Sequence, residues 1–555
     1  MRKIIFLLIG IVSSVSFGQN IPFTLQKSLE FKDEHKASVI VFSDVNEKGN
    51  LLIVRSYKSS SLSPNKGFYI ENYTKDLKLI SDFDFEIKHP LSEKNSVILS
   101  VFSMNDALQI VEIYFDIKEK SYICQANSIS NDFKVSKKEL FRLTKEEVKN
   151  YGSFSLQDLF YKRENELWTN DNSGDLESPS DYSNSSSFSG LFTATYGTDK
   201  QSSNMTLVVN ESKTAFAIAL DVKGKTNEAL KLYLFDAYLN KKITTDFSPK
   251  VKDKKYVFQN IQVSQNGHDV FLLAKAFLEE EKGKKHGGKY VFELTKIGVD
   301  SQKSQTIETN ENYINSLKLT FHNNELICLG FYSDLQDYKY KGISYFKLNA
   351  NTLALLTSKF NLFTEQFMID KYGENKDKAL KFLSFRKLFF TSTNDLVFNA
   401  EEEFTTTSGG GGAMNGGARS YQNFDDIVSA KLSSDGDLIW ARNINKNQAV
   451  SDEDDSFISY SSMIKNNETY FFINTGEKIK KLKNDRIEFG QVRKNKSNLN
   501  VIRINTNGDF DYKEILDNEN SPVPFMVSKG AVIDANSILF LGRKGSTKQL
   551  LKVTL

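Results

Sequence analysis

FDDIVSAKLSSDGDLIWARNINK, residues 424–446, is the stretch that decides the fold. Apolar and polar residues alternate from Val428 to Leu432, and the turn sequence SDGD follows. The two-residue period then resumes from Leu438 to Trp440. Alternation on both sides of a short turn rich in Asp and Gly is typical of a β-hairpin. The stretch therefore predicts two paired strands.

The same hairpin pattern recurs along almost the whole chain. From residue 38 the sequence repeats strand, tight turn, strand, longer connection, strand, turn and strand, at a spacing of about 55 to 72 residues. Asn, Asp and Gly tolerate the positive φ that tight turns need. The first turns of the successive units lie at residues 46–49, 105–106, 210–212, 265–267, 322–324, 393–395, 465–467 and 534–536. This spacing predicts a repeated four-stranded sheet.

The last repeat is incomplete. It stops at QLLKVTL, residues 549–555, after its third strand. A lone strand predicted at residues 23–31 can supply the fourth strand. Joining both termini in one sheet closes a β-propeller and removes its open edge. We therefore expect an all-β fold, a single β-propeller of eight four-stranded blades whose last blade is closed by the N-terminal strand.

The composition agrees with a β fold. The chain has 43 Phe and 23 Tyr, which favour strands, and only 7 Pro, which would interrupt strand pairing. Its 72 basic and 70 acidic residues are mixed along the chain and give a formal net charge of +2. Such a chain has no global field that attracts nucleic acid or an anionic membrane. We expect neither nucleic acid as a partner nor a membrane-spanning segment.

The first 18 residues, MRKIIFLLIGIVSSVSFG, predict a signal peptide. A short basic start precedes the apolar run from Ile4 to Val12, and small residues, Ser16 and Gly18, precede the cleavage point. The apolar run is too short to span a bilayer, which argues against an N-terminal anchor. No Cys follows it to carry a lipid. We expect export and a mature periplasmic chain, residues 19–555, folded as one domain.

Residues 144–202 interrupt the repeat with a gap of about twice its period. Thr144 and Glu147 form a capping box, which predicts a short helix at the start of this insertion. A strand-like piece around Trp168 and a Ser- and Asn-rich loop follow. A degenerate ninth blade is the alternative interpretation of this insertion. A second short helix is predicted at residues 364–373, between the fifth and sixth repeats.

Metal and disulfide chemistry have little support in the sequence. Cys124 and Cys328 lie in separate apolar strand-like runs, and we expect two buried free thiols. No two of the five His residues have ligand spacing, so no zinc or iron site is expected. The acidic run SDEDDS, residues 451–456, offers oxygens that calcium accepts, but it lacks a complete ligand loop. We expect no cofactor, with calcium at this run as the weaker alternative.

No catalytic motif is visible in the sequence. SFSG, residues 187–190, lacks the first Gly of a nucleophile elbow. The Gly-rich run at residues 408–418 joins strand to strand and has no Lys-Ser or Lys-Thr pair after it, which predicts a flexible loop and not a phosphate site. Among 70 acidic residues, no glycosidase pair can be named. We therefore assign no catalytic residue and expect a protein that is not an enzyme.

Part of the opening hairpin resembles a motif of a known propeller family. Ser433, Asp435 and Trp440 are similar to the Asp-box turn of sialidase-like propellers, S-x-D-x-G-x-T-W. Asp437 replaces the Gly of that motif and Ile439 replaces its Thr, and the motif occurs in one copy. The resemblance implies a propeller hairpin and no sialidase activity.

A second resemblance, to a group of bacterial proteins, rests on three segments: LYLFDAYLNKK, DIVSAKLSSDGDLIWARNINKNQ and GISYFKLNANT. Over most of residues 203–520 the chain resembles a group of secreted, uncharacterised β-propeller-like proteins of Bacteroidetes bacteria. The resemblance brings no catalytic residue with it. Such bacteria often send cargo across the outer membrane with a C-terminal sorting domain, whereas this chain ends in a predicted blade strand. We therefore expect retention in the periplasm.

The connections between strands predict where a partner binds. In a four-stranded meander the first-to-second and third-to-fourth turns share one face of the disc, and all other connections share the opposite face. The long connections all fall on the second face, at residues 57–66, 144–202, 279–288, 333–340, 407–421, 451–456 and 474–496. Variable loops on a rigid scaffold are frequent recognition sites. We expect a protein partner, such as an outer-membrane transport or secretion complex, to dock on this face.

Four residues of these loops are candidate partner contacts, Trp168, Arg419, Tyr421 and Asp454. Arg, Tyr and Trp are the residues that most often dominate interface energy, and the mixed charge of the loops suits a protein surface better than a polyanion. The expected function is a non-catalytic interaction propeller, an accessory or plug subunit. Three alternatives stay open: a hydrolase of glycans or peptides that works in the central channel, a sensor of small ligands, and loops that are only tolerated insertions.

Overall fold

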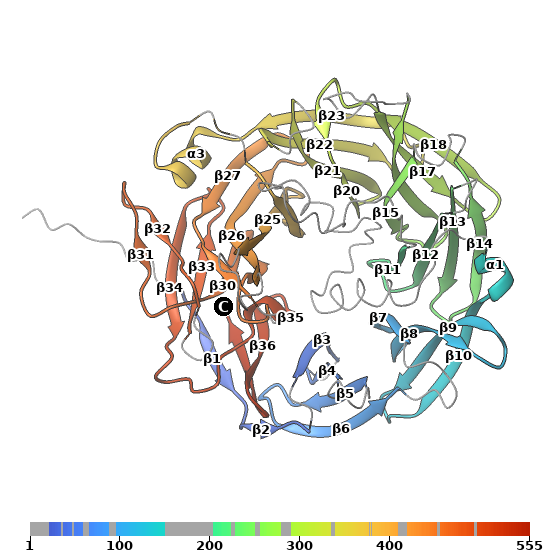
Figure 1. Cartoon of the computed structure of the whole chain (residues 1–555), viewed down its shortest axis with the longest axis horizontal. Helices are drawn as coiled ribbons and strands as arrows, with labels where there is room; N and C mark the ends of the chain where they lie inside the picture. The colour runs from blue at the N-terminus through green and yellow to red at the C-terminus, as the bar shows by residue number, and fades with distance from the viewer. Residues whose placement is uncertain are drawn as a thin grey trace, which may run out of the picture.

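The computed structural model places eight antiparallel sheets in a closed ring, and the chain runs once around this ring (Figure 1). Each sheet is one blade of a β-propeller. The structure describes residues 21–34, 37–46, 49–58, 66–87, 96–149, 204–223, 228–249, 256–278, 290–334, 339–376, 378, 380–408, 419–451, 455–492 and 497–555. The prediction of an all-β propeller with eight blades is confirmed.

Blades one to four have four strands each, which follow one another in sequence order. Blades one and two contain β3 (Ala37–Val45), β4 (Leu51–Lys58), β5 (Lys66–Tyr73), β6 (Leu79–Glu86), β7 (Val97–Met104), β8 (Ala107–Asp116), β9 (Ser121–Ser130) and β10 (Val135–Thr144). Blades three and four contain β11 (Asn204–Val209), β12 (Ala215–Lys223), β13 (Glu228–Asp236), β14 (Lys241–Phe247), β15 (Tyr256–Val263), β16 (Val270–Phe277), β17 (Tyr290–Ile297) and β18 (Gln302–Ile307).

Blades five to seven carry additional short strands. Blade five contains β20 (Lys318–His322), β21 (Glu325–Ser333), β22 (Gly342–Asn349) and β23 (Leu355–Leu362), with β19 (Tyr313–Ile314) paired to β21. Blade six contains β24 (Leu383–Phe390), β25 (Leu396–Ser408), β26 (Arg419–Leu432) and β27 (Leu438–Ile444), with β28 (Gln448–Val450) paired to β26. Blade seven contains β29 (Tyr460–Lys465), β30 (Glu468–Thr475), β33 (Asn498–Ile504) and β34 (Phe510–Leu516), and β31 (Lys480–Lys481) pairs with β32 (Ile487–Glu488) in a small separate sheet.

Blade eight joins the two ends of the chain. Its inner strands are β35 (Ala531–Asp534), β36 (Ser537–Lys544) and β37 (Thr547–Thr554), and the short 3-10 helix η3 (Val527–Lys529) precedes them. The outer strands come from the N-terminal region, β1 (Thr24–Lys27) and β2 (Phe31–Lys32), and both pair antiparallel with β37. The predicted closure of the last blade by the N-terminal strand is confirmed.

The hydrophobic core lies between neighbouring blades. In the opening hairpin, Val428 and Ala430 are fully buried and pack with blade five residues such as Tyr345. Ile427 and Trp440 pack with residues of blade seven instead. Since successive side chains of a strand point to opposite faces of the sheet, the two-residue period of the sequence supplies one apolar face for each neighbouring blade.

The tight turns have the backbone geometry that their sequences predict. Asn323 and Asn324 of blade five have φ values of 47° and 62°. In the opening hairpin Gly436 has φ 84°, and a Cβ added there would lie 2.2 Å from the Tyr345 ring. Gly436 is therefore required both by its φ, which disfavours other residues, and by the close approach of blade five.

Both predicted helices are present at the rim of the ring (Figure 1). Helix α1 (Lys145–Lys149) begins with the predicted capping box, in which the Glu147 amide donates to Thr144 Oγ1 at 3.2 Å. Helix α3 (Glu365–Tyr372) is capped by Thr364 and ends at Gly373, which has φ 81°. Within the described ranges, no helix has the length and apolar character needed to cross a bilayer.

Strand order fixes the two faces of the disc. Because neighbouring strands of each blade are antiparallel, the first-to-second and third-to-fourth turns lie together on what we call the turn face. The second-to-third connections and the connections between blades lie on the opposite, loop face. The strands that flank each long connection confirm the predicted sorting of these connections to the loop face.

Candidate functional site

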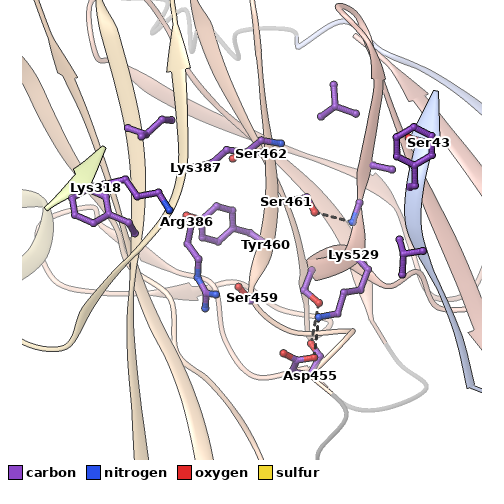
Figure 2. Close-up of a pocket in the computed structure, with 18 of the residues that line it drawn as sticks. Ser43, Lys318, Arg386, Lys387, Asp455, Ser459, Tyr460, Ser461, Ser462 and Lys529 are labelled. Carbon is purple, nitrogen blue, oxygen red and sulfur yellow. Dashed lines mark hydrogen bonds and ion pairs between the residues drawn. The ribbon is translucent and has the colours of Figure 1, made fainter. Parts of the chain in front are cut away.

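A cavity of about 490 Å³ lies inside the ring. Its wall includes residues of the inner strands β3, β15, β20, β24, β29 and β35, so six blades contribute to it (Figure 2). Its residues on β29 and β35 lie at the starts of these strands, and inner strands start at the loop face. The cavity therefore lies in the part of the channel that is near the loop face, and its volume is typical of small-molecule sites, roughly 300–1,000 Å³.

Four cationic side chains line the cavity, Lys318, Arg386, Lys387 and Lys529. Asp455 is the one acidic residue among the described lining residues. Lys529 is buried and its Nζ lies 3.3 Å from Asp455 Oδ1, so these two charges offset each other (Figure 2). Lys387 is an exposed residue of the inner strand β24. Basic residues therefore outnumber acidic ones among the described lining residues.

Arg386 belongs to a buried ion-pair cluster at the base of the cavity. Its Nη2 lies 2.7 Å from Glu401 Oε2 and 3.1 Å from Glu403 Oε2. Glu401 is fully buried and also binds Lys446 Nζ at 2.8 Å and the Ser459 hydroxyl at 2.6 Å. Burial alone would raise the pKa of Glu401, but Lys446 and Arg386 outweigh it and hold the pKa below its usual value. The residues of this cluster are ionised, and their ion pairs stabilise the fold at this position.

Tyr460 lines the cavity beside Arg386 (Figure 2). It is 7% exposed, and its hydroxyl has no hydrogen-bond partner among the described residues. Burial, followed by the negative charge of Glu401, raises the pKa of this phenol well above its usual value, so the hydroxyl keeps its proton. A buried hydroxyl without a partner costs free energy, which makes Tyr460 an unusual feature of this wall.

Three serines of the cavity wall, at residues 459, 461 and 462, form structural hydrogen bonds. Ser461 Oγ accepts from the Gly530 amide at 2.9 Å and donates to the Val527 carbonyl (Figure 2). Ser459 donates to Glu401, and Ser462 accepts from Asn399 at 3.2 Å. None of these described contacts joins a serine to a histidine base, the arrangement that activates a nucleophile.

The two described histidines are not among the residues that line the cavity. His268 is in the β15–β16 turn, and His322 stacks on Phe390 at the turn face, with ring centroids 3.7 Å apart. His35, His89 and His286 lie outside the described residues. Cys124 and Cys328 are buried free thiols, as predicted. Within the described ranges, no group of three or more His, Cys, Asp and Glu side chains converges on a possible metal site.

Blade six extends beyond its neighbours on the loop face. Its central strands β25 and β26 have 13 and 14 residues, and they stay paired to Ser408 and Arg419, well past the ends of β24 and β27. We call residues 403–408 and 419–424 the blade-six arm. The strand β28 pairs with the arm at Gln422 to Phe424. Strand pairing therefore continues along the arm, so the arm is an ordered β-hairpin extension of blade six.

A second buried ion-pair cluster holds helix α3 against the base of this arm. Lys371 Nζ lies 2.9 Å from Glu402 and 2.7 Å from Asp426. Burial is the main cause that raises the pKa of Glu402, to about 7; Lys371 opposes it, and Asp426 adds to it. Arg442 Nε donates to Asp370 of the helix at 2.5 Å.

Another strong restraint on α3 comes from the loop between β31 and β32, where Arg486 Nη1 donates to the Lys371 carbonyl at 2.7 Å. Helix α3 is therefore held by blade six and by the inserted hairpin of blade seven at the same time.

The four predicted partner contacts have different outcomes. Arg419 is the first residue of β26, opposite Ser408, and Tyr421 is a half-buried residue of the same strand, opposite Thr406. Trp168 and Asp454 lie outside the described residues, as does most of the insertion at 144–202. Among the acids considered for calcium, Asp455 is described, and it pairs with Lys529.

Sequence reasoning missed the cavity residues Lys318, Lys387 and Tyr460. One signal was available, because the inner strand LSFRKLFF of blade six places two adjacent cations, Arg386 and Lys387, in an otherwise apolar strand. The pairing of β24 with β25 shifts register between Phe385 and Lys387, and both Arg386 and Lys387 line the cavity. What the sequence could not give is the convergence of these residues from different blades.

No protein-family model matches the chain. No curated protein sequence matches it either. Among solved structures, the β-propeller domain of the Trilobed protease from Pyrococcus furiosus is 8% identical, with a TM-score of 0.30, over 73% of this chain and 93% of that chain. The acylaminoacyl peptidase of Pyrococcus horikoshii is 8% identical, with a TM-score of 0.32, over 80% of this chain and 49% of that chain.

Prolyl oligopeptidase B from Galerina marginata is 8% identical, with a TM-score of 0.36, over 92% of this chain and 55% of that chain. This chain thus spans about half the length of these two peptidases. The similarity concerns the β-propeller fold. We take no activity from these proteins.

Proposed function

We propose that this protein is a periplasmic, non-catalytic interaction β-propeller that binds a protein partner on its loop face. The partner we propose is an outer-membrane transport or secretion complex, in which this propeller is an accessory or plug subunit. The observation that carries the proposal is the blade-six arm. It projects from the loop face, where the other long connections also lie, and a projecting braced hairpin is suited to contact another protein.

Rigid anchoring supports a recognition role for the arm. Glu403, at the base of the arm, binds Arg386 at 3.1 Å and accepts from the Gln422 side chain at 2.7 Å. Asn423 donates to the Phe404 carbonyl at 3.0 Å across the two strands. Because the paired strands of the arm are ordered before binding, the arm itself loses little conformational entropy when a partner docks on it. Arg419 and Tyr421 on the arm, with Trp168 and Asp454 of the other loop-face connections, are the proposed contacts.

The engaged serines of the cavity favour binding over hydrolysis. Ser459, Ser461 and Ser462 each form a hydrogen bond that holds neighbouring segments together. A nucleophile for a glycan or peptide hydrolase would instead need a base within hydrogen-bond reach. We therefore rank the hydrolase below the interaction propeller.

A pull-down from the native cell envelope tests the proposal. The bait is the full-length chain, compared with a variant in which residues 407–421 are shortened to a tight turn and with a variant that lacks residues 170–199. We expect stoichiometric capture of an outer-membrane protein by the full chain and weaker capture after the arm is shortened, with unchanged circular dichroism. The control variant is Lys134→Gln, a substitution of an exposed residue on the turn face that leaves all loops intact. It should capture the outer-membrane protein as strongly as the unmodified chain does. Unchanged capture by both deletion variants would reject the loop face as the docking surface, and turnover of a glycan or peptide panel would favour the hydrolase.

A further inference from the structure

The two edges of the blade-six arm are covered unequally. On the β26 side, β28 pairs with residues 422–424. On the opposite side, the pairing with β24 ends at Glu402, and beyond it the Glu403 amide donates to the Phe382 carbonyl at 2.9 Å. Among the described residues, the stretch of β25 at 404–408 pairs with β26 alone. We call the other side of this stretch, which faces the line of β24, the open edge.

The chain that precedes β24 does not continue along the open edge. Phe382, directly before β24, has φ 58°, in the left-handed region, so the backbone leaves the strand direction there. Leu380 exchanges two backbone hydrogen bonds with Tyr340 of blade five, at 2.8 and 2.9 Å. The segment that could have extended β24 is therefore paired with the neighbouring blade.

Backbone hydrogen-bonding groups point to the open edge. Alternate residues of a strand direct these groups to the same side. Since the Glu403 amide donates toward β24, the amides and carbonyls of Thr405 and Thr407 also point to that side, where no described strand pairs with them. Phe404 faces β26 instead, and its carbonyl accepts from Asn423 at 3.0 Å. Such a row of donors and acceptors is a template for an added strand.

The sequence of the open edge favours strand addition. Residues 404–408 read FTTTS, with no charged residue, no Pro and no Gly. The described outer strands of the blades, in contrast, each carry at least one charged residue, such as Lys359 on β23 and Arg442 on β27. Charged residues on edge strands oppose pairing with other chains, and Thr favours strands. The open edge lacks the protection that the outer edges have.

An aromatic pair at the start of the open edge indicates which side chain an added strand carries there. The Phe382 and Phe404 rings have centroids 5.3 Å apart, and both side chains are half-buried. Because Phe404 directs its backbone groups to β26, it occupies a non-hydrogen-bonded position on the open edge, where side chains of paired strands come closest. Aromatic residues pair favourably with aromatic and β-branched residues across strands. An apolar residue opposite Phe404 would cover the exposed part of this pair.

We propose that the loop-face partner donates an extended, uncharged segment of about five residues, which adds to the open edge as an antiparallel strand in line with β24. The segment pairs with the backbone of Thr405 and Thr407 and places an apolar side chain opposite Phe404. This inference deepens the proposed function and rests on it, because the donor of the strand is the proposed partner.

A synthetic peptide tests the open edge without the native partner. The probe is a fluorescent, acetylated peptide of about seven residues, alternating Thr and Val with Phe at its centre, and fluorescence anisotropy follows its binding to the full mature chain. We expect saturable binding with a Kd below about 1 mM. The same peptide, N-methylated at two adjacent central residues, has lost a donor on both of its edges. It should bind at least about tenfold more weakly, because backbone hydrogen bonds are lost.

Two matched variants of the chain test the position of the site. Thr405→Pro combined with Thr407→Pro removes the two amides that point to the open edge and leaves the donors toward β26 in place. Pro is tolerated on an edge strand where its nitrogen faces away from the sheet, so circular dichroism should not change. This variant should bind the probe at least about tenfold more weakly. Thr405→Val combined with Thr407→Val keeps both amides, and it should bind the probe as the unmodified chain does.

The outcomes separate this inference from the proposed function. Loss of both probe binding and outer-membrane capture in the Pro variant, but not in the Val variant, supports the added strand. Capture that the Pro variant retains would reject the added strand and leave the proposed function intact. Probe binding by a chain that captures no outer-membrane protein would reject the proposed partner and keep the open edge as a strand-binding site.

Two further results would overturn the inference. The first is a probe that does not bind saturably, or that binds equally to the Pro and Val variants. The second is a dimer of the unmodified chain that is absent from the Pro variant in analytical ultracentrifugation, because a second copy would then occupy the open edge.

Discussion

Arg55 Nη1 lies 2.6 Å from Asp33 Oδ2, and both side chains are almost completely buried. Asp33 follows the N-terminal strands of blade eight, whereas Arg55 is in the second strand of blade one. The same guanidinium binds Glu71 through two hydrogen bonds, of 2.9 and 2.5 Å. Lys548 of β37 lies 3.7 Å from Asp33 on the other side. The N-terminal segment is therefore fixed to the first and the last blade by a buried carboxylate as well as by strand pairing.

The first prediction concerns this carboxylate. Asp33→Asn should lower the free energy of unfolding by about 3 kcal/mol, because it removes one buried carboxylate from the ion pairs of Arg55 and Lys548, while the pair of Arg55 with Glu71 remains. Urea unfolding followed by circular dichroism measures this change. Asp132→Asn is the matched control, since Asp132 and Lys134 form an exposed pair on the turn face, and its free energy of unfolding should change little, because exposed ion pairs contribute little to stability. Equal losses in the two variants would contradict the role of Asp33.

The second prediction concerns the closing strand. Deletion of residues 19–33 removes β1 and β2 and exposes the edge of β37. An exposed strand edge pairs readily with other chains, so the truncated protein should melt earlier and aggregate. Thermal melting and light scattering of the truncated and full mature chains measure both effects. Identical melting curves would show that the ring does not depend on this closure.

The third prediction concerns pH. Burial, opposed by Lys371 and assisted by Asp426, raises the pKa of Glu402 from its usual 4.5 to about 7. The folded state therefore binds more protons than the unfolded state between these two values, and this group's contribution to stability falls as pH rises through that window. The slope is at most about 1.4 kcal/mol per pH unit.

Glu402→Gln removes this titration. The stability of the variant relative to the unmodified chain should therefore increase from pH 5 to pH 8, as measured by urea unfolding at several pH values. Burial also raises the pKa of Asp425, to about 6, but Asp425 is present in both proteins and its effect cancels to a first approximation. Parallel pH profiles of the two proteins would contradict the prediction.

The fourth prediction concerns the opening hairpin. Gly436→Ala should destabilise the fold by about 1–3 kcal/mol, because Ala disfavours positive φ and because its Cβ would overlap the Tyr345 ring, which overpacks the site. Gly49→Ala is the control, since Gly49 has φ 76° but no atom within 4 Å of the added Cβ. The excess loss at Gly436 measures the contact with Tyr345, and equal losses would mean that φ alone requires this glycine.

Several features were determined by local sequence alone. Alternation along residues 424–446, Asn, Asp and Gly at the turns, and the capping box of Thr144 and Glu147 act within a few residues of the chain. They predicted the hairpins, the blade count and the helix that opens the insertion. The incomplete last repeat also predicted the strand pairing of the termini, because an unpaired strand edge is unfavourable and only one spare strand was available to cover it.

Tertiary structure alone decided which side chains meet. Lys318, Lys387 and Tyr460 come from three blades, and the ion pairs of Asp33 and Glu402 join segments that local patterns do not connect. A two-residue period shows that a side chain faces a neighbouring blade, but not which residue it meets there, because that depends on the register and stagger of sheets far apart in sequence. The sequence by itself therefore determined the repeating sheet and its closure, whereas the closed ring, by bringing inner strands from six blades around one axis, decided which residues line the cavity.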